Sequence, residues 1–176
     1  MKSLRESLFN SGLIQKDIMY HPRTKYELVK CIKEQLDLQG PDANLNIIDV
    51  SKMTDMSYLF IRMNVRNIDI SDWDVSNVKD MSFMFSGCRL FNSDLSNWDV
   101  SRVEYMAGMF RECSSFNSDL SKWNVSSVKD ITGMFDGCHS FNSDLSNWDV
   151  SSVKDMYVVF YGCRSLKKLP SWYEKS

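Results

Sequence analysis

The chain repeats itself every 25 residues, and few folds can accommodate such a period. When the sequence is shifted by this interval, apolar residues of the same type coincide in five columns. The columns are Val50, Val75, Val100, Val125 and Val150; Phe60, Phe85, Phe110, Phe135 and Phe160; Met56, Met81, Met106, Ile131 and Met156; Trp73, Trp98, Trp123 and Trp148, with Ile48 in the first copy; and Cys88, Cys113, Cys138 and Cys163. A period of this length is typical of a solenoid, in which each coil buries its apolar face against its neighbours.

Within one unit, the spacing of apolar residues suggests local structure. They are Leu95, Trp98 and Val100, followed by Val103, Met106, Phe110 and Cys113. The first three match the LxxLxL spacing of a leucine-rich repeat, which predicts inward side chains and a short strand over 98–100. The next four recur at intervals of three and four, which predicts a short helix. We therefore expect an α/β repeat fold: a short leucine-rich-repeat-like solenoid of about five 25-residue coils, with short parallel strands and short helices.

A helical cap is predicted before the first coil. Thr24 and Glu27 have the spacing of a capping box, and Gly40-Pro41 would end the helix. Tyr26, Val29, Ile32 and Leu36 would lie on its apolar face. The predicted division of this single domain is residues 1–44 for leader and cap helix, 45–165 for the five-coil solenoid, and 166–176 for a C-terminal cap.

The two ends of the chain carry weaker patterns. Leu4, Leu8, Leu13 and Ile14 predict either a first cap helix or a mobile leader. After Cys163 the repeat decays, and Leu166, Leu169, Pro170, Trp172 and Tyr173 are expected to lie over the last coil. Trp172 is one residue out of register, which fits a cap better than a sixth repeat.

The repeat unit resembles the BspA-like leucine-rich-repeat family, whose 25-residue version was long catalogued as a domain of unknown function. The resemblance is carried by 91–113, 116–138 and 141–163, and by a lead-in at His21-Pro22-Arg23-Thr24-Lys25 and residues 44–51. It covers about residues 20–165. It implies relatives in host-associated bacteria and mobile elements, many of them surface proteins that bind other proteins. Residues 2–8 are similar to short N-termini of phage-encoded proteins of gut bacteria.

Charge and hydropathy exclude some classes of function. A formal charge of −2 and a pI near 5.7 argue against direct binding of nucleic acid, which needs a clustered basic face. No segment reaches the about 20 apolar residues of a membrane-spanning helix, and the N-terminus lacks the pattern of a signal peptide. We therefore expect a cytoplasmic protein without membrane contact, and surface or virion association stays open.

The tryptophan and cysteine columns each allow two interpretations. Inward packing of the tryptophans is expected from their LxxLxL position, and the alternative is an exposed aromatic ladder for sugars or peptides. Zinc sites use close pairs of ligands such as C-x2-4-C, whereas these cysteines recur every 25 residues. We therefore expect free, buried thiols and no metal.

Aspartate and asparagine also form columns, which are Asp69, Asp94, Asp119 and Asp144; Asp49, Asp74, Asp99 and Asp149, with Asn124 between the last two; and Asn67, Asn92, Asn117 and Asn142. Stacked carboxylates repel, so we expect each to accept hydrogen bonds from turn N–H groups, aided by Lys79, Lys129 and Lys154. The alternative is calcium binding, but the glycine-rich repeat of calcium-binding β-solenoids is missing from the sequence. The asparagines are expected to bond side chain to backbone between coils.

For function, the sequence favours binding over catalysis. His21 and His139 lack an evident nucleophile partner, and no P-loop, G-x-S-x-G or H-E-x-x-H motif occurs. We therefore expect neither an enzyme nor a cofactor. Exposed positions that differ between copies are the candidate partner-binding residues, with unconstrained surface drift as the alternative. They are Arg89, Arg102, Tyr105, Arg111, His139, Tyr157, Tyr161 and Arg164.

The resulting hypothesis is a protein-binding module, monomeric or weakly self-associating, that presents a rigid repeat surface to a protein of unknown identity. One version is a phage or mobile-element protein that binds or inhibits a bacterial protein. The alternative is an adhesin-like surface or structural component that binds host protein or glycan.

Overall fold

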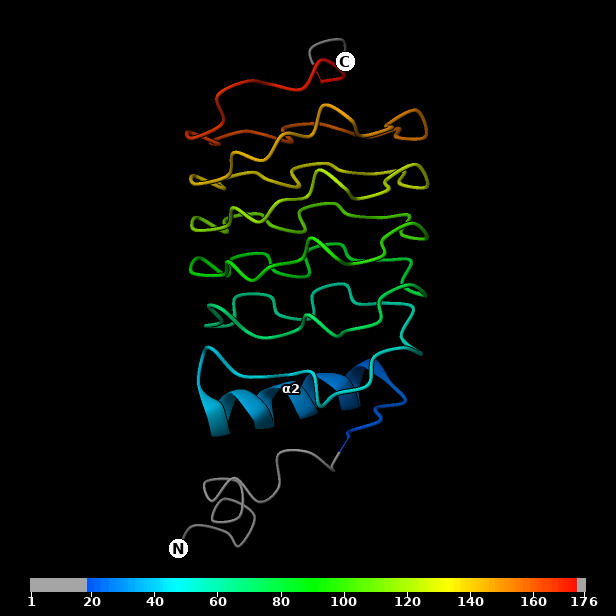
Figure 1. Ribbon diagram of the computed structural model, residues 1–176, viewed down its shortest axis with the longest axis vertical. Helices are drawn as coiled ribbons and strands as arrows, with labels where there is room; N and C mark the ends of the chain where they lie inside the picture. The colour runs from blue at the N-terminus through cyan, green and yellow to red at the C-terminus, as the bar shows by residue number, and fades with distance from the viewer. Residues whose placement is uncertain (1–18, 174–176) are drawn as a thin grey trace, which may run out of the picture.

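The computed structural model describes residues 19–173, which form flat coils stacked along one axis (Figure 1). Helix α2, Lys25–Gln39, lies across the N-terminal end of the stack. Parallel bridges join residues 25 apart, namely Asn44 to Asp69, Asp55 to Asp80, Asp80 to Tyr105, Tyr105 to Asp130 and Asp130 to Asp155. The prediction that positions one repeat apart lie above one another is therefore confirmed. The apolar leader residues Leu4, Leu8, Leu13 and Ile14 lie outside the described residues.

The predicted α/β fold class is wrong. Within residues 19–173, α2 is the only helix, and the coils pair through isolated bridges without forming strands or a sheet. The segment 98–100 is irregular where a strand was expected. The segment 103–113 consists mostly of consecutive turns where a helix was expected.

The reason lies in how the backbone N–H groups alternate between two kinds of acceptor. Gly108 and Phe110 donate to Thr132 O and Met134 O of the next coil at 2.8 and 3.0 Å. Between them, Met109 donates to Met106 O at 3.2 Å and so closes a turn within its own coil. Neither the i to i−4 bonds of a helix nor the continuous ladder of a strand can form when every second N–H is committed in this way.

Two left-handed residues in each coil have the same effect. Gly108 has a φ of 57° and Glu112 a φ of 60°, whereas a right-handed helix needs values near −63°. The three- and four-residue spacing of Val103, Met106 and Phe110 nevertheless buries all three, because each turn also returns the chain to the same side.

The interior is built from ladders of identical side chains. Trp98 is 5% exposed, and its ring lies 6.4 Å from that of Trp73 at an interplanar angle of 10°. Its indole Nε1 donates to Ile70 O at 3.2 Å, so the one polar atom of the ring is satisfied by the preceding coil. Phe85 and Phe110 stack in the same way at 5.8 Å. The inward orientation of the tryptophan column is confirmed.

The cysteine and asparagine columns also connect coils. Cys113 Sγ donates to Phe85 O at 3.0 Å, and the cysteines at 88, 138 and 163 make the equivalent contact. All five cysteines are free; Cys88, Cys113 and Cys138 are buried, while Cys31 and Cys163 are partly exposed. Asn117 N donates to Asn92 Oδ1 at 2.8 Å, and the same bond joins Asn142 N to Asn117 Oδ1. Free thiols and side-chain-to-backbone asparagine bonds between coils are thus confirmed.

Helix α2 begins and ends as the capping residues predict. Thr24 Oγ1 accepts from Glu27 N at 3.2 Å, and Glu27 Oε2 accepts from Arg23 N at 2.7 Å. Gly40, with a φ of 83°, donates its N–H to Leu36 O at 2.8 Å.

The buried face of α2 differs from the prediction. It consists of Leu28, Ile32 and Gln35, whereas Tyr26 is 80% exposed and Val29 and Leu36 are partly buried. The sequence pattern alone could not locate this face, because apolar residues lie on more than one side of the helix.

The C-terminal segment continues the tryptophan ladder for one more step. The Trp172 ring stacks on Trp148 at 6.3 Å, and its Nε1 donates to Leu145 O at 2.8 Å. Tyr173 meets Phe160 edge to face at 5.2 Å, whereas Leu169 is 39% exposed. Trp172 therefore lies over the last coil as expected, and its shift of one register position does not prevent it from occupying the ladder.

Candidate binding surface

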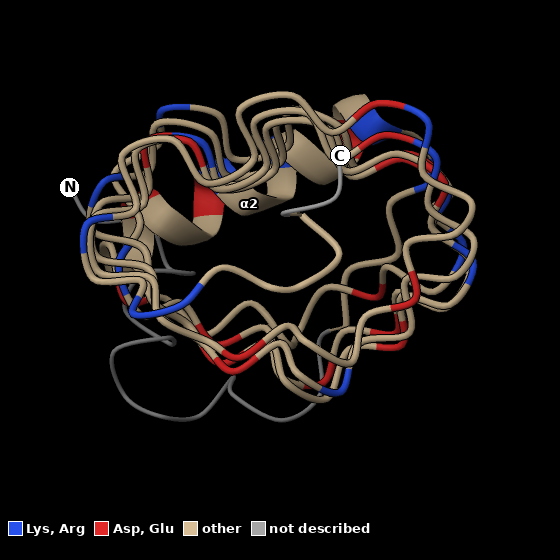
Figure 2. Cartoon of the chain, turned by 90° about the horizontal axis from the view of Figure 1, so that it is seen from above, with Lys and Arg blue, Asp and Glu red and all other residues tan. Residues whose placement is uncertain are grey.

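The acidic columns are held by the turns that follow them. Ser96 N donates to Asp94 Oδ1 at 2.9 Å, and Ser101 N donates to Asp99 Oδ1 at 3.0 Å. The same bond, from the N–H two residues further on, recurs in both columns, and Asn124 Oδ1 accepts it in place of an aspartate. Figure 2 shows acidic residues of successive coils lying over one another on the side away from α2. The predicted role of these aspartates in the turns is confirmed.

The same bonds favour the ionised form of each carboxyl group. The backbone N–H of Ser96 lowers the pKa of Asp94, and hydrogen bonds from Ser51 lower the pKa of Asp49 to about 2. Two of the lysines that were predicted to compensate the charge of the stacked aspartates pair with a glutamate instead. Lys129 Nζ lies 2.5 Å from Glu104 Oε2, and Lys79 Nζ lies 3.9 Å from Glu104 Oε1. These two lysines therefore neutralise a glutamate of their own column.

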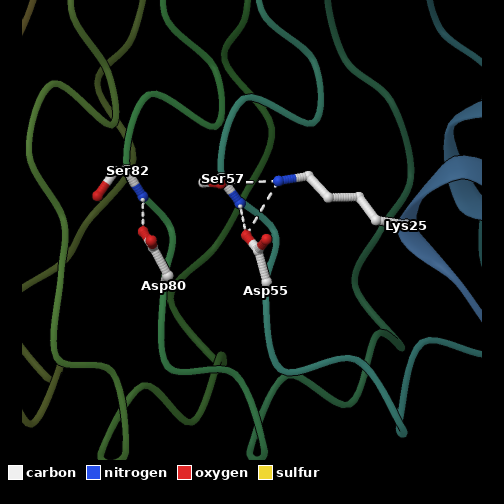
Figure 3. Close-up of polar contacts among 5 residues, drawn as sticks. All are labelled: Lys25, Asp55, Ser57, Asp80 and Ser82. Carbon is white, nitrogen blue, oxygen red and sulfur yellow. Dashed lines mark hydrogen bonds and ion pairs between the residues drawn. The ribbon is translucent and has the colours of Figure 1, made fainter.

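A third carboxylate column is present that the sequence reasoning missed. Asp55, Asp80, Asp130 and Asp155 are stacked through the backbone bridges, with Tyr105 in the middle. Asp55 accepts from Ser57 N at 2.8 Å and Asp80 from Ser82 N at 2.8 Å (Figure 3). The sequence signal for this column was the recurrence of aspartate at 25-residue intervals, which Tyr105 interrupts.

Helix α2 neutralises the first member of this column. Lys25 Nζ donates to Asp55 Oδ1 at 3.0 Å and to Ser57 Oγ at 2.7 Å (Figure 3). Burial opposes ionisation of Asp55, but hydrogen bonds from Ser57 and Lys25 outweigh it and lower its pKa. The contact fixes the start of α2 to the first coil.

Within residues 19–173, the carboxylate and cysteine columns provide neither a cluster of metal ligands nor a reactive thiol. Across residues 19–173, no three His, Cys, Asp or Glu side chains are placed to hold a metal ion together. Burial raises the pKa of the Cys88 and Cys163 thiols to about 12 and that of Cys113 well above its usual value. A thiol that remains protonated is a poor nucleophile and a poor metal ligand.

The eight predicted partner-binding residues are all exposed, but they lie in several columns. Arg89, His139 and Arg164 share one column, and Arg111 and Tyr161 share another. Tyr157 and Tyr161 are the most exposed aromatic members, at 74% and 73%. Arg111 is engaged with Asp136 at 3.1 Å and Arg102 with Asn77 Oδ1 at 3.0 Å.

A basic groove of about 910 Å³ runs along the stack beside Arg102. Its lining is Lys79, Arg102, Glu104, Lys129 and Lys154, together with Ser126, Ser127, Ser151 and Ser152. Glu104 is paired with Lys129 and Lys79. Lys154 is the lining cation nearest the C-terminus, and it forms no ion pair within residues 19–173. Arg89 lines a separate hollow with Arg62, Gly87 and Leu90.

Three large side chains of the last coil are exposed at the C-terminal end of the described stack. Tyr157, Val158 and Tyr161 are 74%, 51% and 73% exposed. The equivalents of Val158 in two earlier coils, Gly108 and Gly133, are buried. The last coil therefore exposes three large apolar side chains close together.

In the described part of the chain, no helix is long and apolar enough to cross a membrane. No curated protein and no solved structure matches the chain. One family model does match, over residues 34–131 and again over 98–175, and its description is "Mycoplasma protein of unknown function, DUF285". The two matches overlap within the repeats and together run from the second half of α2 to the C-terminal segment. The chain belongs to this DUF285 family.

Proposed function

We propose that this protein is a non-enzymatic protein-binding module that presents a rigid repeat surface. The observation that carries the proposal is a pair of highly exposed tyrosines, Tyr157 and Tyr161, on a tightly bonded backbone. The carbonyls of these two residues accept from Gly133 N and Gly137 N, both at 2.8 Å. Aromatic side chains on a fixed backbone lose little conformational entropy on binding, which is why tyrosine is common at interfaces.

The contrast with the other coils supports this proposal. In the column of Tyr157, earlier coils carry Ser82 and Ala107, and in the column of Tyr161 they carry Ser86 and Asp136. Neither tyrosine is needed for the stack, since the equivalent coils close without one. Large apolar surface that does not stabilise the fold is a common mark of an interaction site.

Capture from the producing cell tests the proposal. The full chain is immobilised, and retained proteins are identified by mass spectrometry. Exchange of Tyr157, Tyr161, Arg111 and Arg164 for Ser is expected to abolish capture while the thermal unfolding midpoint changes little, because these side chains are exposed. Unchanged capture by this variant would refute the surface.

The matched control changes the same number of residues in one exposed polar column, which lies between the two acidic columns in the sequence. Ser substituted for Asn97, Asn147, Lys122 and Asp72, all exposed, is expected to leave capture intact. Loss of capture in both variants would indicate a non-specific effect, and the protein-binding proposal would then fail.

As a narrower form of this function, we propose a BspA-like protein of a phage or mobile element that acts in the cytoplasm and binds or inhibits a bacterial protein. Its support is the likeness of the repeat unit and of residues 2–8 to such proteins. The identity of the captured partner tests it. Recovery of a bacterial cytoplasmic protein is expected, whereas recovery of only host proteins or glycans would favour an adhesin.

A further inference from the structure

Within residues 19–173, the last coil has a row of hydrogen-bond donors without acceptors. In the coil before it, the N–H groups of residues 131, 133, 135 and 137 donate to the carbonyls of residues 155, 157, 159 and 161 at 2.8 to 3.0 Å. The equivalent donors of the last coil are Met156, Val158, Phe160 and Gly162, and none of them has an acceptor within residues 19–173. We call residues 155–162 the open edge.

Apolar side chains accompany this row of donors. Tyr157, Val158 and Tyr161 are exposed, and Met156 is only partly buried although its equivalents in other coils are buried. Trp172 and Tyr173 cover Phe160, which is 7% exposed, but leave the three exposed residues uncovered. An edge with free N–H groups and apolar side chains is a template for addition of a further chain segment.

We propose that the open edge binds an extended acidic segment of a protein partner, which runs parallel to residues 155–161 and adds one more layer to the stack. This inference rests on the proposed function as a protein-binding module. The backbone conformation required of the bound segment follows from the interface between successive coils of this chain, because the segment would extend the same hydrogen-bonding pattern. It must offer a carbonyl at every second residue, as residues 155, 157, 159 and 161 offer theirs to the coil below.

The charge of the occupant follows from ion pairs between coils. Lys129 pairs with Glu104 one coil away at 2.5 Å, and Arg111 pairs with Asp136 one coil away at 3.1 Å. Lys154 is the last member of the column of Lys129 within residues 19–173. Residues 150–173 contain four Lys and Arg but one Asp, although the whole chain has a net charge of −2. An acidic side chain in an added layer would therefore find Lys154 at pairing distance.

A second copy of this chain is a poor occupant in either orientation. Two open edges facing each other would bring donors against donors, so no hydrogen bonds could form between them. A head-to-tail arrangement would require the first coil to be accessible, but α2 covers it through Leu28, Ile32 and the Lys25 to Asp55 ion pair. We therefore assign the occupant to a different protein.

A synthetic peptide provides the probe. It copies residues 152–164, with Lys154 and Arg164 replaced by Glu and Cys163 by Ser, because each coil of this chain stacks on a similar one. The readout is amide hydrogen exchange of the full chain by NMR. We expect the amides of Met156, Val158, Phe160 and Gly162 to exchange rapidly in the free protein and at least tenfold more slowly with saturating peptide. The amides of residues 131, 133, 135 and 137 are protected throughout.

Charge exchange provides the matched control. The acidic peptide is expected to bind at least tenfold more tightly than a peptide that retains Lys154 and Arg164. In the Lys154→Glu protein this preference should reverse, because the terminal charge of the column then has the opposite sign. Lys154 is exposed, so its replacement is compatible with an intact stack.

Two results would overturn the inference. One is absence of peptide binding at millimolar concentration, and the other is binding that leaves the four open-edge amides unprotected. Either result leaves the proposed function standing if a cellular partner is captured through the exposed tyrosines and arginines. Conversely, failure to capture any partner, with the peptide still protecting the edge, would refute the proposed function alone.

Discussion

At the scale of single residues, two positions in every coil have a backbone φ between 50° and 77°. One column contains Tyr58, Phe83, Gly108, Gly133 and Val158, and the other contains Arg62, Gly87, Glu112, Gly137 and Gly162. Glycine occupies half of these positions because it adopts left-handed backbone without steric cost. The remaining residues adopt this backbone at a cost of about 1 kcal/mol or more each, which the hydrogen bonds to neighbouring coils offset.

A comparison of Gly108 with Gly133 separates two costs of a side chain in this column. One is the strain of left-handed backbone, and the other is steric clash with a neighbouring residue. Both have a φ near 58°, but a Cβ on Gly108 would lie 2.4 Å from the Phe83 ring, whereas one on Gly133 would meet only ordinary contacts at 3.8 Å. We expect Gly133→Ala to cost about 1 kcal/mol of unfolding free energy and Gly108→Ala about 1 to 3 kcal/mol more. Urea unfolding monitored by tryptophan fluorescence measures both.

The Phe83→Ala background provides the control for this comparison. Without the ring, Gly108→Ala should cost no more than Gly133→Ala. An equal cost of the two substitutions in the wild-type background would show that Phe83 moves aside freely.

At the scale of elements, α2 is the one helix among residues 19–173, and it covers the first coil. Its first turn is stabilised from within by Thr24 and Glu27 and from outside by the contact of Lys25 with Asp55. Because a 15-residue helix is only marginally stable alone, its cap and its docking should reinforce each other.

Removal of the helix cap should therefore weaken the N-terminal end of the stack. Thr24→Ala is expected to reduce the free energy of unfolding by about 1 kcal/mol, because the N–H of Glu27 loses its acceptor. Thr24→Ser keeps the hydroxyl group and should remain close to wild type. Equal stability of the Ala and Ser variants in urea unfolding would contradict a capping role for this hydroxyl.

At the scale of the whole molecule, the stack has a covered end and an open one. Each coil contacts only its neighbours, so stability is a sum of local terms and loss of structure can begin at an end. Among residues 19–173, the N–H groups of 156, 158, 160 and 162 have no acceptor at the C-terminal end, whereas α2 packs against the N-terminal end. We therefore expect the stack to open from its C-terminal end.

The cysteine column reports on this opening, because each coil from the second to the fifth has one buried or partly buried thiol. In native buffer, alkylation should modify Cys163 first, then Cys138, Cys113 and Cys88 in that order. Burial raises the pKa of these thiols, so reaction requires opening of the coil. Peptide mapping by mass spectrometry gives the four rates. Equal rates would mean that the stack opens as one unit, and fastest reaction of Cys88 would refute opening from the C-terminal end.

Acid should destabilise the whole stack through its aspartate columns. Hydrogen bonds in the folded state lower the pKa of these groups below the value of about 3.9 in an unfolded chain. Their contribution is present above the unfolded value and is lost as pH falls through the folded value, about 2 for Asp49. The free energy of unfolding should therefore decrease between about pH 4 and pH 2.

A variant that keeps the turns but removes the charge provides the test. Replacement of Asp94, Asp119 and Asp144 by Asn should reduce the slope of stability against pH, because Asn124 already accepts the same turn N–H in this protein. Stability at pH 7 should change little. An unchanged slope between pH 4 and pH 2 would mean that these three carboxyl groups do not contribute to it.

The sequence by itself determined which residues share a column and which apolar columns are buried. Identical residues 25 apart, such as Trp98 and Trp123, can all be shielded from water only if they stack, so the period was sufficient to predict the coils, the inward tryptophans and the free buried thiols. Capping residues act locally, and for that reason Thr24 and Gly40 marked the ends of α2 correctly. The exposed candidates such as Tyr157 were identified by their departure from the repeat.

Only the tertiary structure decided the conformation of each coil and the state of its ends. Apolar spacings of three and four residues suit a helix and a series of turns equally well, and the choice depends on acceptors in the neighbouring coil, such as Thr132 O for Gly108 N. The buried face of α2 was likewise set by the coil it covers. The free donors of the open edge become visible only when every N–H is followed to its acceptor, because hydrogen bonding between layers leaves no mark in the order of residues.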